Sequence, residues 1–183
     1  MLFRSVERFA VTGGLLTTGG VANFCGPMEG QGEVFDEILD RLGRCNALGE
    51  PQRASVFHYE LLAIALQELL LARGVKLLLH TRLAAVRREG RRLTHCIPAG
   101  KSGLEALAAR QFIDCTGDGD LARFAGMEVM KGRAVDGLQL PMSMMYFVRH
   151  VGADHVVLQA PPEAVGIIQT ADDLPMTSIW PDG

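Results

Sequence analysis

Paired cysteines, clustered aromatic residues and long apolar runs are all missing from this sequence of 183 residues. Its four cysteines, at positions 25, 45, 96 and 115, form no C-x-x-C motif and no zinc-binding spacing. This pattern predicts a reduced, cytoplasmic protein with neither a disulfide framework nor a metal site. The apolar stretch over residues 61–71 is interrupted by Gln67 and Glu68. We therefore expect no membrane span, and no stretch has the pattern of a signal peptide.

Strong charge is also missing, because the formal net charge is only −3, and aromatic residues make up 6% of the chain. The arginines at positions 87, 88, 91 and 92 flank Gly90 with no aromatic residue between them, which is typical of a solvated hairpin tip. No nucleic acid partner and no membrane partner is expected. The length and the 48% hydrophobic content are those of an ordinary globular chain of about one domain.

Two helices are predicted in the first half of the chain. Residues 34–42 are amphipathic, with Glu37–Arg41 and Asp40–Arg44 as i,i+4 pairs on the polar side. A longer helix over residues 57–73 is expected to begin at a cap near Ser55 and to end at Gly74. Its leucines cover most of its circumference, which predicts that it is buried on a sheet.

Strands follow the second helix. The nearly continuous apolar run of residues 75–80 is typical of a parallel strand covered on both faces. Three short strands with polar turns predict an antiparallel meander, and a later long strand predicts a second antiparallel layer. The meander covers residues 83–88, 93–98 and 104–110, and the later strand covers residues 138–150.

The strongest functional signal is a strand-to-helix turn between residues 110 and 125. The short apolar run from Phe112 to Cys115 predicts a buried strand, and a short helix is expected from about Asp118 to just before Gly126. Thr116 and two glycines lie between them. Glycines let the backbone approach a ligand closely, and the N–H groups at a helix start bind an anion such as a pyrophosphate.

This turn has two other interpretations. Asp118 could simply cap the helix, with the glycines only forming the turn. The spacing of Gly117, Gly119 and Ala122 also fits the G-x-G-x-x-A fingerprint of a Rossmann fold. That fingerprint requires a full helix and a second parallel strand, whereas here the helix meets Gly126 after about two turns and a loop follows.

The amino-terminal part combines a strand end with a glycine-rich loop. Val6-Glu7-Arg8 has the pattern of a strand that ends in a carboxylate. Residues 9–32 contain seven glycines and three threonines with little charge, which favours backbone packed against a flat partner over a solvated linker. Tight turns alone are the alternative.

This order of elements and motifs resembles the FAD-dependent oxidoreductase family of the glutathione-reductase-like flavoprotein superfamily. The similarity covers about residues 5–150 and is closest at Asp114-Cys-Thr-Gly-Asp-Gly-Asp120. It implies an α/β fold: an incomplete Rossmann-like FAD-binding domain over residues 1–130, with a parallel sheet, helices and a β-meander crossover. It also implies the start of a second, antiparallel substrate-side domain over residues 131–183, with FAD as the cofactor.

The resemblance further implies which residues contact FAD. Glu7 would hold the adenosine ribose, and the backbone of Leu83 would contact the adenine. Gly117 and Asp118 would lie near the pyrophosphate and the ribityl chain. The implied cofactor-binding residues are Glu7, Arg8, Gly13, Gly14, Thr18, Leu83, Thr116, Gly117 and Asp118.

One family motif is missing, because no G-x-G-x-x-G precedes Glu7. Family members place the pyrophosphate at the helix that follows this motif. We therefore expect a fragment without its first βα unit, with weakened FAD binding and an unpaired sheet edge. The expected function is FAD-mediated hydride or electron transfer with a small-molecule substrate, and no catalytic residue is identified. The alternative is an inactive remnant or interaction module that binds no flavin.

Overall fold

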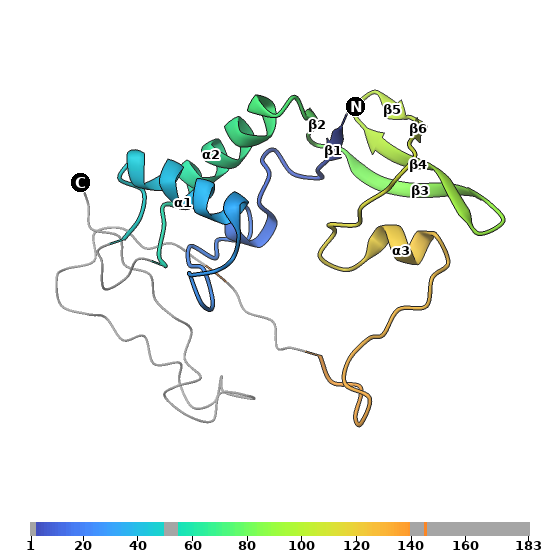
Figure 1. Ribbon diagram of the computed structural model, residues 1–183. Coiled ribbons are helices and arrows are strands. Elements are labelled where there is room, and N and C mark those ends of the chain that lie inside the picture. Colours follow the sequence, from blue (N-terminus) through green and yellow to red (C-terminus); the bar gives the residue numbers. More distant parts are fainter. Residues whose placement is uncertain (1–2, 50–54, 140–144, 146–183) are drawn as a thin grey trace.

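The computed structural model describes residues 3–49, 55–139 and 145. Figure 1 shows two helices and a glycine-rich loop on one side and a β-meander with a short helix on the other, with a small parallel sheet between them. In chain order the elements are β1 (Arg4–Val6), η1 (Gly14–Leu16), α1 (Glu33–Arg44), α2 (Tyr59–Ala72), β2 (Lys76–Leu78), β3 (Arg82–Glu89), β4 (Arg92–Gly100), β5 (Gly103–Leu104), β6 (Leu107–Ala108) and α3 (Asp120–Phe124).

The hydrophobic core lies between α1, α2 and the loop that precedes α1. Leu42 of α1 is fully buried, and Leu62 of α2 and Phe57 just before α2 are each 1% exposed. Phe24 of the loop packs against Phe57 with ring centroids 4.3 Å apart and meets Phe35 edge-on at 5.0 Å. Burying a side chain of this size contributes about 1.5–3 kcal/mol. This cluster is therefore a major apolar contribution to the stability of the chain.

Charged side chains join the outer surfaces of α1 and α2. The two predicted pairs are confirmed, with 3.0 Å between Arg41 and Glu37 and 2.6 Å between Arg44 and Asp40. Glu37 also accepts hydrogen bonds from Arg73 at the end of α2. The hydrogen bonds from Arg73 and Arg41 lower the pKa of Glu37 to about 2. The network therefore ties the two helices together with a carboxylate that stays ionised in ordinary buffers.

The predicted end of α2 is confirmed and its predicted cap is wrong. Gly74 has a φ of 69° and closes the helix, as the sequence indicates. The cap near Ser55 is wrong because Val56 and Phe57 form antiparallel β-bridges with the loops after η1 and α1. Those bridges keep the backbone extended, so the helix begins only after His58.

The prediction that α2 is buried on a sheet holds only in part. Its buried side faces α1 and the core, whereas Ile64 and Leu71 on another face are 55% and 54% exposed. Among the described strands, α2 contacts the parallel sheet mainly through β2. The described part of the sheet is too small to cover the rest of the helix.

β1 and β2 form the predicted parallel pair, with Ser5 opposite Leu77. The two strands are three residues each, and every residue in them is exposed or half-buried. The prediction that β2 is covered on both faces is therefore wrong for the part of the chain that the structure describes. In that part the sheet contains these two strands, and α2 contacts β2 without burying it.

The predicted antiparallel meander is confirmed, with one difference in its last strand. β3 pairs with β4, and the pairing has irregular register at two places. The expected strand over residues 104–110 is divided into β5 and β6, which both pair with β4. A continuous strand is not formed because β5 pairs at the end of β4 and β6 pairs with its middle.

The predicted buried strand from Phe112 to Cys115 is wrong. These residues carry no strand assignment, and Ile113 is 80% exposed. A β-rich segment forms a strand only where another strand offers hydrogen bonds, and the described part of the chain offers none beside it. The short helix that follows is confirmed as α3, which ends before Gly126.

The strand predicted over residues 138–150 lies almost wholly outside the described residues, as does most of the second domain that is predicted over residues 131–183. Among the described residues, no helix combines the length and the apolar character that crossing a membrane requires.

Candidate functional site

Glu7 lies directly after the carboxyl end of β1, where that strand runs parallel to β2. Its N–H donates to the carbonyl of Leu78 at 2.9 Å, and its own carbonyl accepts from the N–H of Thr81. The Glu7 Oε1 atom accepts from the N–H of Phe9 at 2.9 Å, which fixes the carboxylate beside the strand end. Next to it, the Arg8 guanidinium lies 4.6 Å from the centre of the Phe9 ring. In open α/β sheets, ligands bind outside the carboxyl ends of parallel strands.

The glycine-rich loop turns sharply immediately after this strand end. Gly13 has a φ of 109° and Gly14 has a φ of 54°, a region that favours glycine. A Cβ atom on Gly13 would lie 2.6 Å from Thr17 Cγ2 and 2.9 Å from a methyl group of Leu66. The buried Thr17 hydroxyl donates to the carbonyl of Thr12 at 2.8 Å. This loop is therefore packed against α2 and held by its own hydrogen bonds.

Gly14 and Thr18 lie on the open side of the loop. No heavy atom lies within 4 Å of the position that a Cβ on Gly14 would take, so its backbone is accessible from that side. The Thr18 hydroxyl donates to the Gly14 carbonyl at 3.0 Å. The loop therefore exposes its backbone at Gly14, and nearby Thr18 lines a groove.

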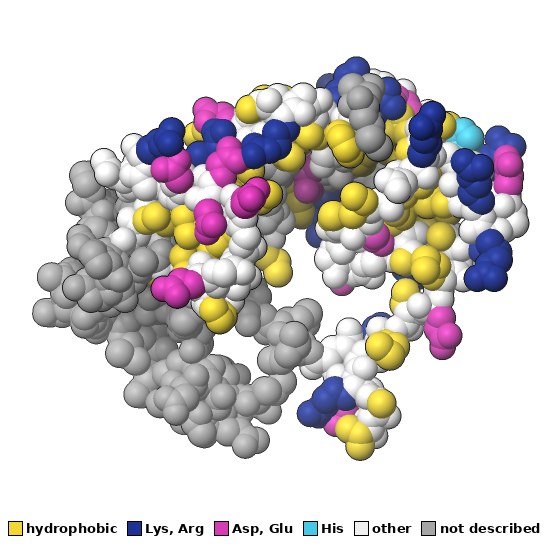
Figure 2. All heavy atoms as spheres, viewed as in Figure 1, with side chains coloured by type: hydrophobic (Ala, Val, Ile, Leu, Met, Phe, Trp, Pro, Cys, Tyr) yellow, Lys and Arg dark blue, Asp and Glu magenta, His cyan; other side chains and the backbone are white. Residues whose placement is uncertain are grey.

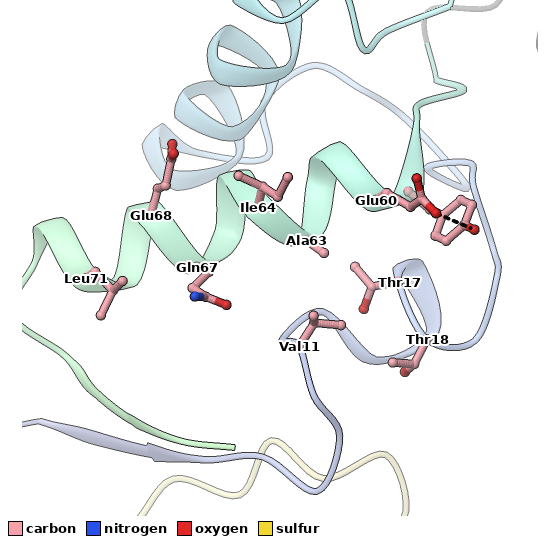
Figure 3. Close-up of a pocket in the computed structure, with 10 residues that line it drawn as sticks. Val11, Thr17, Thr18, Glu60, Ala63, Ile64, Gln67, Glu68 and Leu71 are labelled. Atoms are coloured by element: carbon pink, nitrogen blue, oxygen red, sulfur yellow. Dashed lines mark hydrogen bonds between the residues drawn. The ribbon is translucent and has the colours of Figure 1, made fainter. Parts of the chain in front are cut away.

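That groove runs between the loop and the exposed face of α2 and has a volume of about 530 Å³. Figure 3 shows Val11, Thr17 and Thr18 on one wall and the side chains of α2 on the other. The lining is mostly apolar, with Ile64 and Leu71 contributed by α2. Thr18 is the one implied cofactor contact that lines it.

Leu83 lies in β3, two residues after Thr81, which is hydrogen-bonded to Glu7. Leu83 pairs with Pro98 of β4. Thr81, two residues earlier, donates its N–H to Glu7 and its hydroxyl to the Leu79 carbonyl at 2.8 Å. The backbone thus connects Leu83 to the carboxyl end of the parallel sheet through a short, hydrogen-bonded segment.

The turn before α3 is organised by Asp114. Its Oδ1 atom accepts from the Thr116 hydroxyl at 2.7 Å and from the Thr116 N–H at 3.0 Å. Its Oδ2 atom accepts from the N–H of Ala122 at 2.9 Å. The Thr116 oxygen in turn accepts from the N–H of Asp120 at 2.7 Å. The side chains that cap α3 are therefore those of Asp114 and Thr116.

The interpretation of Asp118 as the helix cap is wrong. The residue before α3 is Gly119, in the left-handed conformation with a φ of 67°, and Asp118 is exposed. Because Gly119 provides no side chain, the capping oxygens come from earlier in the turn. Asp118 is therefore left out of the capping network.

Electrostatics support the role of Asp114 as an ionised cap. Partial burial by itself would raise the pKa of this carboxyl. The hydrogen bonds from Thr116 and from the N–H groups of Ala122 and Leu121 outweigh that effect and lower the pKa below its ordinary value. Asp114 accordingly remains charged and committed to the turn at neutral pH.

The structure brings the implied residues together in two groups. Glu7, Arg8, Gly13, Gly14, Thr18 and Leu83 belong to segments around the end of the parallel sheet. Thr116, Gly117 and Asp118 belong to the turn at α3, which contacts β3. Figure 2 shows the surface hollowed between the helical part and the meander with α3. Within the part of the chain that is described, no hydrogen bond joins the two groups directly.

Sequence reasoning missed two residues of the turn region. The sequence pattern assigns Asp114 no role of its own, although an Asp side chain often accepts a hydrogen bond from the backbone two residues on. The sequence predicts Arg88 at a solvated hairpin tip, but its Nη1 atom donates to the carbonyl of Ala125 at 2.7 Å. No local signal in the sequence indicates this second contact, because its partners are 37 residues apart.

A family model described as FAD dependent oxidoreductase matches residues 5–177. Neither a curated protein nor a solved structure gives a significant match.

Proposed function

The chain belongs to the FAD-dependent oxidoreductase family, and from that premise we propose that the end of the parallel sheet and the turn at α3 form two sides of one FAD site. The family implies FAD as the cofactor and a flavin-linked redox function. In the proposal, β1 and β2 belong to an incomplete Rossmann-like sheet. Residues up to about 130 bind FAD, and residues from 131 begin the substrate side.

The position of Glu7 is the single observation that carries this proposal. An acidic side chain at the carboxyl end of a strand suits a ribose, because a carboxylate accepts hydrogen bonds from vicinal hydroxyl groups. The Phe9 N–H holds Oε1, which leaves Oε2 available to a ligand. Glu7 would thus bind the adenosine ribose, with Arg8 and the backbone near Leu83 at the adenine.

The residues at the opposite side also fit the cofactor. A Cβ atom at Gly117 would have no heavy atom within 4 Å, as at Gly14. Both glycines therefore offer open backbone where a flat or anionic group can approach closely. In the proposal, Gly13, Gly14 and Thr18 follow one side of FAD. Thr116, Gly117 and Asp118 contact the pyrophosphate and the ribityl chain.

The chemistry would come from the cofactor. FAD supplies hydride or electron transfer when it is bound, and the protein supplies binding, orientation and electrostatics. The roles of the residues named above are therefore to hold the nucleotide and to fix its position at the sheet end. None of them is assigned a proton-transfer role.

The test is an FAD titration of the 183-residue chain, followed by its visible absorbance and by quenching of free flavin fluorescence. No G-x-G-x-x-G occurs in the sequence, so the titration must extend to high FAD concentrations. We expect Glu7→Gln to weaken binding about tenfold, because a hydrogen bond to a charged group contributes about 1.5–3 kcal/mol. The matched control is Glu105→Gln, which removes an exposed carboxylate between β5 and β6.

Three results are informative. Flavin bands that depend on Glu7 but not on Glu105 support the proposal. Flavin bands that are insensitive to both variants contradict the role of Glu7. A folded, colourless protein at all FAD concentrations contradicts FAD binding by this chain and favours the alternative of a remnant or interaction module.

A further inference from the structure

The placement of α3 requires an explanation, because the helix has little to hold it. It is five residues long and has no buried residue. Helices of this length are unstable alone, since nucleation is costly and few backbone hydrogen bonds form. Contacts at the two ends of α3 must therefore determine where the helix and the preceding turn lie.

The contacts at the amino-terminal end are local. Asp114 and Thr116 bind N–H groups of residues 120 and 122. These bonds define the shape of the turn, but they join the segment only to itself. They cannot fix its position relative to the sheet.

The carboxyl-terminal end is attached to another element by Arg88 of β3. Its Nη1 atom donates to the Ala125 carbonyl at 2.7 Å. The guanidinium also covers Gly126, where a Cβ would lie 3.4 Å from both terminal nitrogens. A cation at a helix carboxyl end interacts favourably with the unpaired carbonyls. Arg88 therefore links α3 to the meander by both charge and packing.

The neighbouring arginines do not share this arrangement. Within the described residues, the side chains of Arg87, Arg91 and Arg92 form no hydrogen bond or ion pair, although all three are exposed on the same hairpin. The contact is thus a property of position 88 and not of a basic hairpin in general.

We propose that Arg88 is a positioning residue for the cofactor turn: it holds α3 against β3 and so fixes the place of Thr116, Gly117 and Asp118. It acts through α3 and does not itself touch FAD. Its effect on FAD rests on the proposed function, whereas its effect on α3 does not.

Hydrogen–deuterium exchange of peptides that cover residues 116–126 tests the proposal directly. Arg88→Ala should increase amide exchange there about tenfold, the change expected when a hydrogen bond from a charged group is lost. Arg88→Lys should restore part of the protection, because it keeps a cation and one donor. Arg91→Ala removes the same charge from the hairpin tip and should leave exchange unchanged.

FAD titration of the same variants provides the second measurement. We expect Arg88→Ala to raise the Kd for FAD severalfold and to shift the flavin absorbance bands. Arg88→Lys should lie between the wild type and Arg88→Ala, and Arg91→Ala should bind as the wild type does. An unchanged Kd and spectrum in Arg88→Ala would overturn the positioning role.

The exchange data separate the two proposals. Wild-type exchange at residues 116–126 in Arg88→Ala, or equal acceleration in Arg91→Ala, overturns the inference. Equal acceleration in α2 also overturns it, because the effect would then be global unfolding. If the wild type binds no FAD, the proposed function fails while the exchange result still decides whether Arg88 positions α3.

Discussion

The helical part and the turn at α3 are stabilised in opposite ways. Around Phe57, three large side chains from different segments have almost no exposed surface, and aromatic rings pack directly against one another. Around α3, no helical residue is buried, and the structure depends on hydrogen bonds that Asp114 accepts and that Arg88 donates. Burial resists change over a wide range of conditions, whereas charged hydrogen bonds depend on pH and salt.

This difference suits the two regions to different tasks. The helical part holds the glycine-rich loop in one place, because Gly13 lies directly against Leu66 of α2. An exposed turn keeps N–H groups and a carboxylate accessible. In the proposed FAD site, the glycine-rich loop would therefore provide a rigid surface, and the turn at α3 would provide polar contacts.

The largest expected effect comes from the core. Phe57→Ala should lower the free energy of unfolding by about 3–5 kcal/mol, because it leaves a cavity among Phe24, Leu42 and Leu62. Urea denaturation followed by circular dichroism measures it. The matched variant is Phe124→Ala in α3, whose side chain is 42% exposed. If Phe124→Ala lowered the free energy of unfolding as much as Phe57→Ala does, the contrast between the two regions would be wrong.

A smaller, local effect is expected at Asp114. Asp114→Asn removes one of two acceptor oxygens and the charge, and should cost about 1 kcal/mol of local stability at neutral pH. Hydrogen exchange at Ala122 measures this loss. Asp118→Asn makes the same change in a side chain outside the capping network. Faster exchange in both variants, or in neither, would contradict the assignment of the cap to Asp114.

The Asp114 cap should also depend on pH. Its pKa is lower in the folded protein than the ordinary value of 3.8. Its contribution is therefore fully present above pH 3.8 and is lost as the pH falls through the folded-state pKa. Protection of Ala122 should accordingly fall in acid before the core around Phe57 does. Simultaneous loss would show that the two regions unfold as one unit.

The smallest effect is expected at the ion pairs between α1 and α2. Glu37→Gln should lower the melting temperature slightly, since Arg73 and Arg41 lose their partner, and high salt should reduce the difference. The contribution of Glu37 is present above its ordinary pKa of 4.5 and is lost as the pH falls through about 2. Asp40→Asn, which breaks a pair within α1 alone, should have less effect. If Asp40→Asn lowered the melting temperature as much as Glu37→Gln or more, the ion pair between Glu37 and Arg73 at the end of α2 would contribute no additional stability.

Sequence patterns predicted the regular elements well because their causes are local. The amphipathic spacing around Ile38 and Leu42 predicts α1, and Gly74 marks the end of α2. The polar turn at Gly90 predicts the β3–β4 hairpin. In each case the residues that determine the element lie within it or next to it.

Features that depend on distant partners were not predicted. Residues 112–115 have a strand-like composition, but no described strand pairs with them. Ser55 resembles a cap, but distant bridges keep the neighbouring backbone extended. The candidate site shows the same division between features with local causes and features that depend on distant partners. The strand-end position of Glu7 follows from local pattern, whereas the contact of Arg88 with Ala125 depends on how the meander folds back.

Gly13 and Gly14 finally show that adjacent residues of the same type can differ in how much replacement they tolerate. At Gly13, any side chain would overlap both Thr17 and Leu66, so crowding and backbone angle both exclude substitution. At Gly14 the space is empty, and the φ of 54° lies where asparagine is also found. A saturation library at these two positions would therefore retain glycine alone at the first and a small polar set at the second.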